Sequence, residues 1–189
     1  MIDCAAATQY VVDKVGDAPI VASLANTKSY LDQVAHDRPT NFYMGNAMGL
    51  ASSVGLGLAL ARKESPVILL DGDGSLLMNL GSLATETVSM PKNLIHVLWD
   101  NKAYLETGHQ PTATAYRTDL AKVAEGAGFE KVERVETLDA FKKAFDKALA
   151  GPGPVFIHAL VEAKRGKGNV NKSPTWYKHR FMDALAVHH

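Results

Sequence analysis

Two short apolar runs that end in polar residues carry the clearest chemical signal in this sequence. The first run, residues 67–70, is followed closely by Gly-Asp-Gly at residues 72–74, and the second, residues 94–99, is followed by Asp-Asn at residues 100–101. Twenty-five residues separate the two motifs. Both runs have the length and composition of buried strands. We therefore expect two strands whose ends present carboxylate and amide groups.

The polar residues after these strands have the chemistry of a magnesium site. If the strands are parallel neighbours, their carboxyl ends meet at the edge of the sheet where open α/β folds bind ligands. The Asp73 carboxylate would then lie beside the amide oxygen of Asn101. Such hard oxygen ligands suit Mg²⁺, which in turn can hold a diphosphate. The alternative is an ordinary strand-to-helix turn in which Asp73 serves only as a cap.

Apolar patterns elsewhere predict strands and helices that alternate along the chain. The predicted strands span residues 19–24, 66–70, 94–99, 131–135 and 155–161. The predicted helices span residues 4–15, 27–34, 49–62, 76–89, 119–126, 138–149 and 176–185, and residues 37–41 are interpreted as a polar turn. This order predicts an α/β fold, a doubly wound, mostly parallel sheet with helices on both faces.

Length and composition favour one packed domain. The chain has 189 residues, of which 47% are hydrophobic, which is enough for a sizeable core. We interpret residues 1–189 as a single domain that ends in a basic tail and a helix over residues 165–189. Residues 165–174 are expected to be mobile.

The composition also argues against several classes of partner. Twenty basic and twenty acidic residues cancel, which leaves no electrostatic footprint for nucleic acid or an anionic membrane. We find no apolar run of about 18 residues, the length that a membrane span needs, and no signal-peptide pattern at the N-terminus. The single cysteine, Cys4, cannot form an internal disulfide, and this fits a reducing cytoplasm. We expect a cytoplasmic protein.

The ordered set of motifs resembles the diphosphate-binding domain of thiamine diphosphate (ThDP) enzymes. In that family Gly-Asp-Gly is followed, after about 25 residues, by Asn-Asn or Asp-Asn. Residues 42–51 and 55–61 resemble the preceding cofactor loop and helix. Residues 104–112 are similar to the Glu-Thr-Gly-Gly-Gln segment of the sulfopyruvate and phosphonopyruvate decarboxylase branch. The resemblance covers roughly residues 5–165 and implies the ThDP-binding fold.

The resemblance implies which residues hold the diphosphate and its metal. Asp73, Asn101 and the backbone carbonyl of Ala103 would bind Mg²⁺, although the family usually has glycine where Ala103 stands. A backbone ligand survives that exchange if φ stays negative. The Gly74 and Ser75 amides would favour phosphate. The cofactor-binding residues expected in this region are Gly72, Asp73, Gly74, Ser75, Asn101, Ala103, Tyr104 and Leu105.

A second implied contact is with the organic part of the cofactor. In the family a bulky side chain wedges between the two rings of ThDP, and here that residue is Met48. The Asn46 carbonyl would accept a hydrogen bond from the amino group of the pyrimidine. The chain reads Asn46-Ala47 where the family often reads Gly-Ser, but the contact comes from the main chain. The alternative is that Met48 is only a core residue.

The family also needs an activating glutamate, which lies in a separate pyrimidine-binding domain about as large as this chain. Glu86 and Glu106 fall in diphosphate-domain segments and are poorly placed for that task. The resemblance therefore implies a partner, an α subunit that carries the pyrimidine-binding domain. Two-subunit sulfopyruvate decarboxylases have a chain of this length as their β subunit. We expect an α₂β₂ or larger assembly.

The resemblance gives candidate catalytic residues after the metal loop. Thr107, His109 and Gln110 should face the thiazolium side of the cofactor. His109 could donate a proton or bind an anionic substrate group, or it could be only an exposed loop residue. Glu106 could assist acid–base steps. The basic side chains of the tail could fold over a sulfonate or phosphonate or form a solvated face; they are Lys164, Arg165, Lys167, Lys172 and Lys178.

The leading hypothesis is therefore ThDP- and Mg²⁺-dependent decarboxylation of a small anionic 2-oxo acid that resembles sulfopyruvate or phosphonopyruvate. One alternative is a carboligase subunit like acetolactate synthase. The other is a module that binds ThDP without turning it over.

Overall fold

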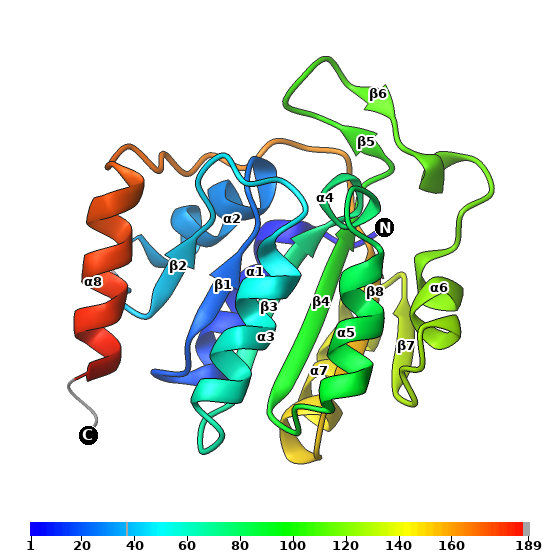
Figure 1. The fold of residues 1–189 in the computed structure, drawn as a ribbon. Coiled ribbons are helices and arrows are strands. Elements are labelled where there is room, and N and C mark those ends of the chain that lie inside the picture. The colour runs from blue at the N-terminus through cyan, green and yellow to red at the C-terminus, as the bar shows by residue number, and fades with distance from the viewer. Residues whose placement is uncertain (37, 187–189) are drawn as a thin grey trace.

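A six-stranded parallel sheet forms the centre of the computed structural model, which describes residues 1–36 and 38–186 (Figure 1). Its strand order is β2-β1-β3-β4-β8-β7. The strands are β1 (Ile20–Ala22), β2 (Asn41–Tyr43), β3 (Val67–Gly72), β4 (Leu94–Asp100), β7 (Val132–Val135) and β8 (Val155–Leu160). Every neighbouring pair runs parallel. The predicted α/β fold is confirmed.

Helices cover both faces of this sheet (Figure 1). One face carries α1 (Cys4–Val15), α2 (Asn26–Ala35) and α7 (Leu138–Ala150). The other carries α3 (Ala51–Ala61), α4 (Asp73–Leu77), α5 (Gly81–Ser89) and α6 (Leu120–Gly126). Helix α8 (Pro174–Ala186) lies beside the edge strand β2.

The side chains of the central strands supply the core of both layers. In β3, Ile68 and Leu70 pack toward α1, α2 and α7, whereas Val67 and Leu69 pack toward α3. This alternation follows from the period of two in a strand. Both faces are covered, so β3 and β4 are mostly apolar, with Asp71, His96 and Asp100 as their polar residues, as is typical of parallel sheets. Their sequence pattern was predictable for this reason.

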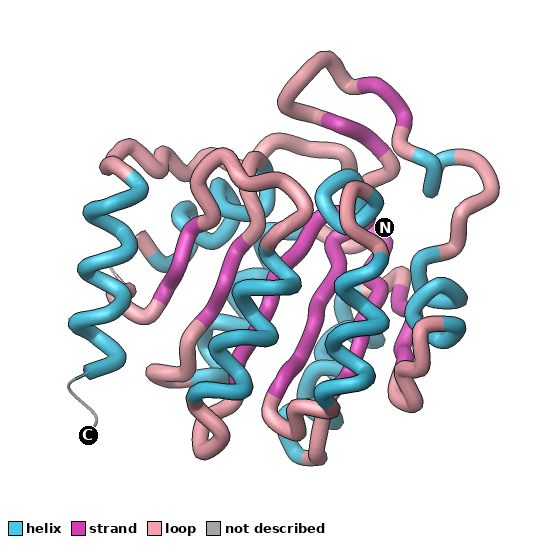
Figure 2. The backbone as a smooth tube through the Cα atoms, viewed as in Figure 1, coloured by secondary structure: helices cyan, strands magenta, loops and turns pink. Residues whose placement is uncertain are grey.

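The chain reverses its direction across the sheet between β1 and β3. From β1 the chain adds β2 on one side, and from β3 it adds β4 on the other. In doubly wound sheets ligands bind at such a reversal, outside the carboxyl ends of the strands. The loops that follow β1, β3 and β4 lie together at that edge (Figure 2).

Several elements differ from the sequence-based predictions. Residues 41–43, expected as part of a turn and loop, form the short edge strand β2. The single helix predicted over residues 76–89 is divided into α4 and α5. Beyond β4 the chain forms a hairpin of β5 (Ala103–Tyr104) and β6 (Gln110–Pro111), followed by the 3₁₀ turn η1 (Ala113–Ala115). This hairpin stands above the carboxyl edge of the sheet (Figure 2).

The segment predicted to be mobile, residues 165–174, is instead bound to α2. Backbone amides of the segment donate to α2 side chains, from Gly166 to Asn26 at 2.7 Å and from Asn169 to Asp32 at 2.7 Å. We call residues 164–173 the strap. The strap leads into α8, where Phe181 packs its ring 5.2 Å from the Phe42 ring of β2.

Two predictions fall partly on residues that the structure does not describe. Asp37 of the expected polar turn and residues 187–189 of the expected closing segment lie outside the described residues. Within residues 1–36 and 38–186, we find no helix that combines the length and the apolar character needed to cross a membrane.

Candidate functional site

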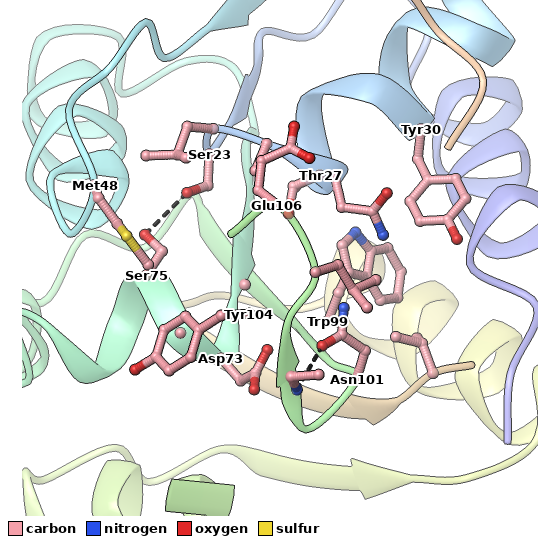
Figure 3. Close-up of a pocket in the computed structure, with 18 of the residues that line it drawn as sticks. Ser23, Thr27, Tyr30, Met48, Asp73, Ser75, Trp99, Asn101, Tyr104 and Glu106 are labelled. Carbon is pink, nitrogen blue, oxygen red and sulfur yellow. Dashed lines mark hydrogen bonds between the residues drawn. The ribbon is translucent and has the colours of Figure 1, made fainter. Parts of the chain in front are cut away.

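A cleft of about 190 Å³ opens at the carboxyl ends of β1, β3 and β4 (Figure 3). It lies at the reversal point that the topology identifies. The sequence-predicted residues that line it are Met48, Gly72, Asp73, Gly74, Ser75, Asn101, Ala103, Tyr104, Leu105 and Glu106. The fold therefore brings both motifs to one cleft.

Asp73 is a buried carboxylate at the start of α4, with a relative exposure of 3%. Its Oδ2 accepts a hydrogen bond from the Thr112 hydroxyl at 2.6 Å. Burial raises the pKa of Asp73 to about 6, against the opposing effect of Thr112, and the nearby Asp100 charge adds to the increase. A desolvated carboxylate of this kind is better stabilised by a cation than by water. This observation favours Asp73 as a metal ligand.

Asn101 and Ala103 line the same cleft. The Asn101 side-chain oxygen accepts a hydrogen bond from the Ala103 amide at 2.9 Å, which closes a tight turn after β4 (Figure 3). The left-handed residue of this turn is Lys102, with φ of 62°, and Ala103 itself lies in the extended strand β5. The replacement of glycine by alanine at this position is therefore tolerated by the backbone.

Gly74 allows Tyr104 to approach the backbone of α4. A Cβ atom at Gly74 would lie 2.5 Å from Cε1 and 2.7 Å from Cδ1 of the Tyr104 ring. These distances are far below van der Waals contact, so any side chain at this position would force the Tyr104 ring or α4 to move. The ring forms one wall of the cleft beside Asp73 and Ser75 (Figure 3).

Ser75 connects three segments of the site. Its hydroxyl accepts a hydrogen bond from Ser23 at the end of β1, at 2.9 Å, and another from the Gly49 amide at 3.1 Å. Through these contacts the loop that carries Met48 is fixed to α4. The Met48 side chain points into the same part of the cleft (Figure 3).

Four sequence-predicted residues are not among the described residues that line the cleft: Asn46, Ala47, His109 and Gln110. Asn46 is exposed, and Ala47 packs against the core beside α3. His109 and Gln110 are exposed at the turn of the hairpin, where the His109 amide donates to the Tyr104 carbonyl at 3.0 Å. Glu106, by contrast, forms part of the exposed rim together with Thr107.

The structure adds residues that the sequence analysis missed. Ser23 follows β1, and Asn26 and Thr27 come from the first turn of α2. The side chains of Tyr30 and Trp99 form the opposite end of the cleft (Figure 3). The available signal was the position of Ser23, a polar residue directly after a predicted buried strand. Trp99 ends the apolar run that was predicted as a strand, but the face toward which its ring points was not predictable from that run.

The remaining glutamate considered from the sequence lies elsewhere. Glu86 is fully buried on α5, where its Oε2 lies 3.1 Å from Nδ1 of His96. This buried pair is on the face of the sheet that carries α5 and α6. Its placement agrees with the prediction that Glu86 does not serve the cofactor.

The arrangement can hold a diphosphate through a hard cation. Asp73, Asn101 and Ala103 line the cleft, and carboxylate, amide and carbonyl oxygens are ligands that Mg²⁺ accepts together with water and phosphate oxygens. No group of three or more His, Cys, Asp or Glu side chains suited to a metal ion occurs within the described residues. A cation at this cleft would therefore need phosphate oxygens in addition to the Asp73, Asn101 and Ala103 oxygens, and this donor set fits a metal–diphosphate pair.

Comparisons with known proteins agree with this geometry. A family model described as thiamine pyrophosphate enzyme, C-terminal TPP binding domain, matches residues 14–159. The chain is 43% identical to sulfopyruvate decarboxylase subunit beta of Methanocaldococcus jannaschii over 176 residues, which are 93% of either chain. It is 38% identical to phosphonopyruvate decarboxylase of Streptomyces viridochromogenes over 167 residues, which are 87% of this chain and 41% of that protein.

A solved structure shares the same fold. Benzoylformate decarboxylase from Polynucleobacter necessarius superimposes with a TM-score of 0.72 over 86% of this chain and 33% of that chain, at 21% identity. Identity this low supports the fold alone. The family match over residues 14–159 and the similarity to the decarboxylase subunit together establish that this chain belongs to the thiamine pyrophosphate (thiamine diphosphate) enzymes, with the C-terminal TPP-binding domain of that family.

Proposed function

We propose that this chain is the diphosphate-binding, or β, subunit of a ThDP- and Mg²⁺-dependent 2-oxo acid decarboxylase. The observation that carries the proposal is the meeting of Asp73, Asn101 and Ala103 at one cleft. The names of the relatives, sulfopyruvate decarboxylase subunit beta and phosphonopyruvate decarboxylase, favour a small anionic 2-oxo acid as substrate.

In this proposal the cleft holds the diphosphate end of the cofactor. Asp73, Asn101 and the Ala103 carbonyl would bind Mg²⁺, and the Gly74 and Ser75 amides would bind phosphate oxygens. Met48 would support the bent cofactor, with the Asn46 carbonyl facing the pyrimidine. The further cofactor contacts proposed for this cleft come from Gly72, Tyr104 and Leu105, and a contact from Ala47 would come from outside the residues that line it.

The reaction breaks the bond between C1 and C2 of the 2-oxo acid, releases CO₂ and places a proton on C2, so that an aldehyde results. ThDP supplies the electron sink that stabilises the charge left at C2. Glu106 on the cleft rim is the proposed acid–base residue of this chain. His109 and Gln110 stand on the hairpin tip, so a role in substrate binding or proton transfer requires that the hairpin or a partner chain bring them to the substrate.

We further propose that a second polypeptide supplies the pyrimidine-binding domain and the activating glutamate, in an α₂β₂ or larger assembly. The term "subunit beta" in the names of three relatives supports a partner chain for them. Exposed apolar side chains on α3, α5 and the segments beside them offer a candidate interface; they are Leu50, Val54, Leu60, Met78, Val88 and Met90. In this assembly the whole chain would act as one diphosphate-binding domain, and a cytoplasmic location stays a prediction.

The test is a reconstitution with the partner chain. Co-purification of this chain with its encoded pyrimidine-domain partner, followed by addition of ThDP, Mg²⁺ and sulfopyruvate, phosphonopyruvate or pyruvate, should release CO₂ and form an aldehyde. Either chain alone and the complex that carries Asp73→Ala serve as controls and should be inactive. A hydroxyketone product would indicate a carboligase instead. A complex that binds ThDP but releases no CO₂ from any of these acids would refute the decarboxylase and favour a binding module.

A further inference from the structure

A continuous series of buried polar contacts leads from Asp73 to Asp100 at the end of β4. Thr112 donates to Asp73 Oδ2 at 2.6 Å, and the hydroxyl oxygens of Thr112 and Thr114 lie 2.8 Å apart. Thr114 donates in turn to Asp100 Oδ1 at 2.8 Å. All four side chains are buried, with relative exposures between 1% and 7%.

The Asp100 end of this series of contacts is anchored on the sheet itself. The second oxygen of Asp100, Oδ2, lies 2.8 Å from Nε2 of His158. Asp100 is the last residue of β4 and His158 belongs to the neighbouring strand β8, and their backbones are held by the parallel ladder between Leu98 and His158. The Lys102 amide also donates to Asp100 Oδ1, at 3.0 Å. Asp100 is therefore a rigid attachment point.

The hairpin after β4 brings the two threonines to Asp73. Thr112 lies 39 residues from Asp73 in the sequence, directly after β6. Its backbone amide donates to the Lys102 carbonyl at 3.0 Å, which closes the base of the hairpin. Thr114 follows in the 3₁₀ turn η1, and its hydroxyl also lies 3.4 Å from Asp73 Oδ2. Both hydroxyl oxygens therefore lie within 3.4 Å of the same oxygen of Asp73.

This geometry assigns different roles to the two oxygens of Asp73. The terminal torsion of an aspartate is broad, so an unsupported carboxylate samples many orientations. Here Oδ2 is held by Thr112, and the carboxylate plane is fixed with it. Oxygen Oδ1 then keeps a defined direction at the wall of the cleft. A fixed ligand binds a cation with less loss of conformational freedom than a rotating one.

We propose that Thr112 and Thr114 are positioning residues that orient the Asp73 carboxylate for a divalent cation, with Asp100 and His158 as their anchor. This inference rests on the proposed function, because it presupposes that Asp73 binds a metal. Partners that orient metal-binding side chains typically change metal affinity by about 10–100-fold when they are removed. A purely structural role of the threonines would instead change the stability of the hairpin and leave the metal affinity unaltered.

The experiment compares Mn²⁺ binding, followed by electron paramagnetic resonance, in the ThDP-saturated complex of this chain with its partner chain. Thr112→Val keeps the shape of the side chain but removes the hydroxyl, and it should weaken Mn²⁺ binding by about 10–100-fold. Thr112→Ser restores the hydroxyl and should stay within about threefold of the original affinity by the same reasoning. Thr114→Val should give a smaller loss than Thr112→Val, and it supplies a second test if Thr112→Val does not fold.

A matched control is available on α1, which packs on the other face of the sheet. Thr8 is also fully buried, and its hydroxyl donates to the Cys4 carbonyl at 2.7 Å within α1. Thr8→Val removes a comparable hydrogen bond and should leave Mn²⁺ affinity unchanged. Mn²⁺ binding by Thr112→Val and Thr114→Val at the original affinity would overturn the positioning role alone. Failure of the unaltered complex to bind Mn²⁺ would overturn both this inference and the proposed metal site.

Discussion

Gly72 of β3 and Trp99 of β4 are partners in one parallel ladder. This pairing explains why Asp73, one residue after Gly72, lines the same cleft as the residues that follow β4. Because side chains alternate between the faces of a sheet, a slip of one residue would reverse the direction of every side chain in β3. The candidate metal site is therefore a consequence of strand register, and mutations that test it should leave that register intact.

The first prediction is that the buried Asp73 carboxylate lowers the free energy of unfolding of the metal-free protein. Its pKa is raised in the folded state from 3.8 to about 6, mainly by burial. The folded protein thus binds more protons than the unfolded chain between these two pH values, so stability falls as the pH rises through this range. Above about pH 6 the raised pKa lowers the free energy of unfolding by at most about 3 kcal/mol.

Asp73→Asn should therefore stabilise the metal-free chain at pH 8 by up to about 3 kcal/mol and give no such gain at pH 4. Urea denaturation at the two pH values measures the difference. The same variant should lose Mg²⁺-dependent ThDP binding in calorimetry. If Asp73→Asn and the unaltered chain are equally stable at pH 8 and both keep Mg²⁺-dependent ThDP binding, burial of the Asp73 carboxylate does not destabilise the fold and Asp73 is not a metal ligand.

The second prediction is a pH dependence of metal binding. Protonation of Asp73 competes with the cation, and its pKa in the metal-free protein is about 6. Below this value the apparent Mg²⁺ affinity should fall by about tenfold for each further pH unit, because one proton must be displaced. Titration calorimetry of the complex between pH 5 and 8, with free ThDP and Mg²⁺ titrated in parallel to subtract the cofactor's own protonation, checks this.

A control for that profile is Glu125→Gln, which removes an exposed carboxylate on α6. It should leave the pH dependence of binding unchanged. An affinity that is constant between pH 5 and 7 after subtraction would contradict the assignment of Asp73.

The central strands β3, β4 and β8 were predictable because they are buried on both faces. The predicted strand over residues 94–99 differs by one residue from β4, and the one over residues 66–70 covers most of β3. β2 was not predictable, since three residues at the edge of a sheet are too short for a periodic pattern. The break between α4 and α5 was missed because residues 76–80 are apolar except for Asn79, and their periodicity does not reveal where a helix changes direction.

The site was predictable only where it follows a strand end directly. Asp73 and Asn101 could be placed from the sequence because the ends of adjacent parallel strands meet. The contact between Ser23 and Ser75 joins residues 52 apart, and it depends on the pairing of β1 with β3. Thr112 reaches Asp73 through the path of the hairpin, and nothing local distinguishes it from an ordinary loop threonine. The strap was misjudged because its anchors are backbone amides, which sequence composition does not reveal.

The third prediction addresses the contact between Gly74 and Tyr104. A methyl group at Gly74 would lie 2.5 Å from the Tyr104 ring, so Gly74→Ala must displace the ring or α4. We expect a loss of about 1–3 kcal/mol in the free energy of unfolding. If the ring is the obstacle, the double variant Gly74→Ala/Tyr104→Ala should be no less stable than Tyr104→Ala alone.

Urea denaturation of the four proteins of this double-mutant cycle gives the coupling energy directly. Gly81→Ala is the control, because a Cβ atom there meets no atom within 4 Å. Strictly additive losses from the two substitutions would show that the alanine disturbs something other than Tyr104.

The fourth prediction concerns the buried pair of His96 and Glu86, whose side chains are both fully buried. Burial opposes protonation of His96, but Glu86 and Asp71 outweigh it, and the pKa of His96 is raised above 6.5. The stability that comes from the charged imidazole is therefore complete below pH 6.5 and is lost as the pH rises through the raised pKa.

His96→Leu leaves Glu86 without its partner in the core and should reduce the free energy of unfolding by about 3–5 kcal/mol at pH 6. The double variant His96→Leu/Glu86→Leu removes both polar groups and should recover most of this loss. Thermal denaturation between pH 6 and 9 is the measurement. A loss below about 1 kcal/mol for the single variant would indicate that the pair is not charged.

The fifth prediction tests whether the strap supports the cleft. Gly168 packs directly on α2, so that a Cβ atom there would overlap the Ser29 carbonyl oxygen and approach the Gln33 amide to 2.7 Å. Because both neighbours belong to the helix backbone, Gly168→Ala must lift the strap. The lift would weaken the bond from Arg165 to the carbonyl of Leu105, now 2.6 Å long. Leu105 lines the cleft, so the effect should reach the cofactor loop.

We therefore expect Gly168→Ala to lose about 1–3 kcal/mol of stability and to show faster amide hydrogen exchange in two segments, residues 165–169 and residues 103–107. Gly126→Ala, where a Cβ atom meets no atom within 4 Å, is the matched control and should leave both segments protected. Faster exchange in the strap alone would show that Arg165 does not support the loop. Arg165 and Leu105 are 60 residues apart in the sequence. Simultaneous loss of protection in both segments would therefore identify the hydrogen bond between these two residues as the physical connection between the basic tail and the cleft.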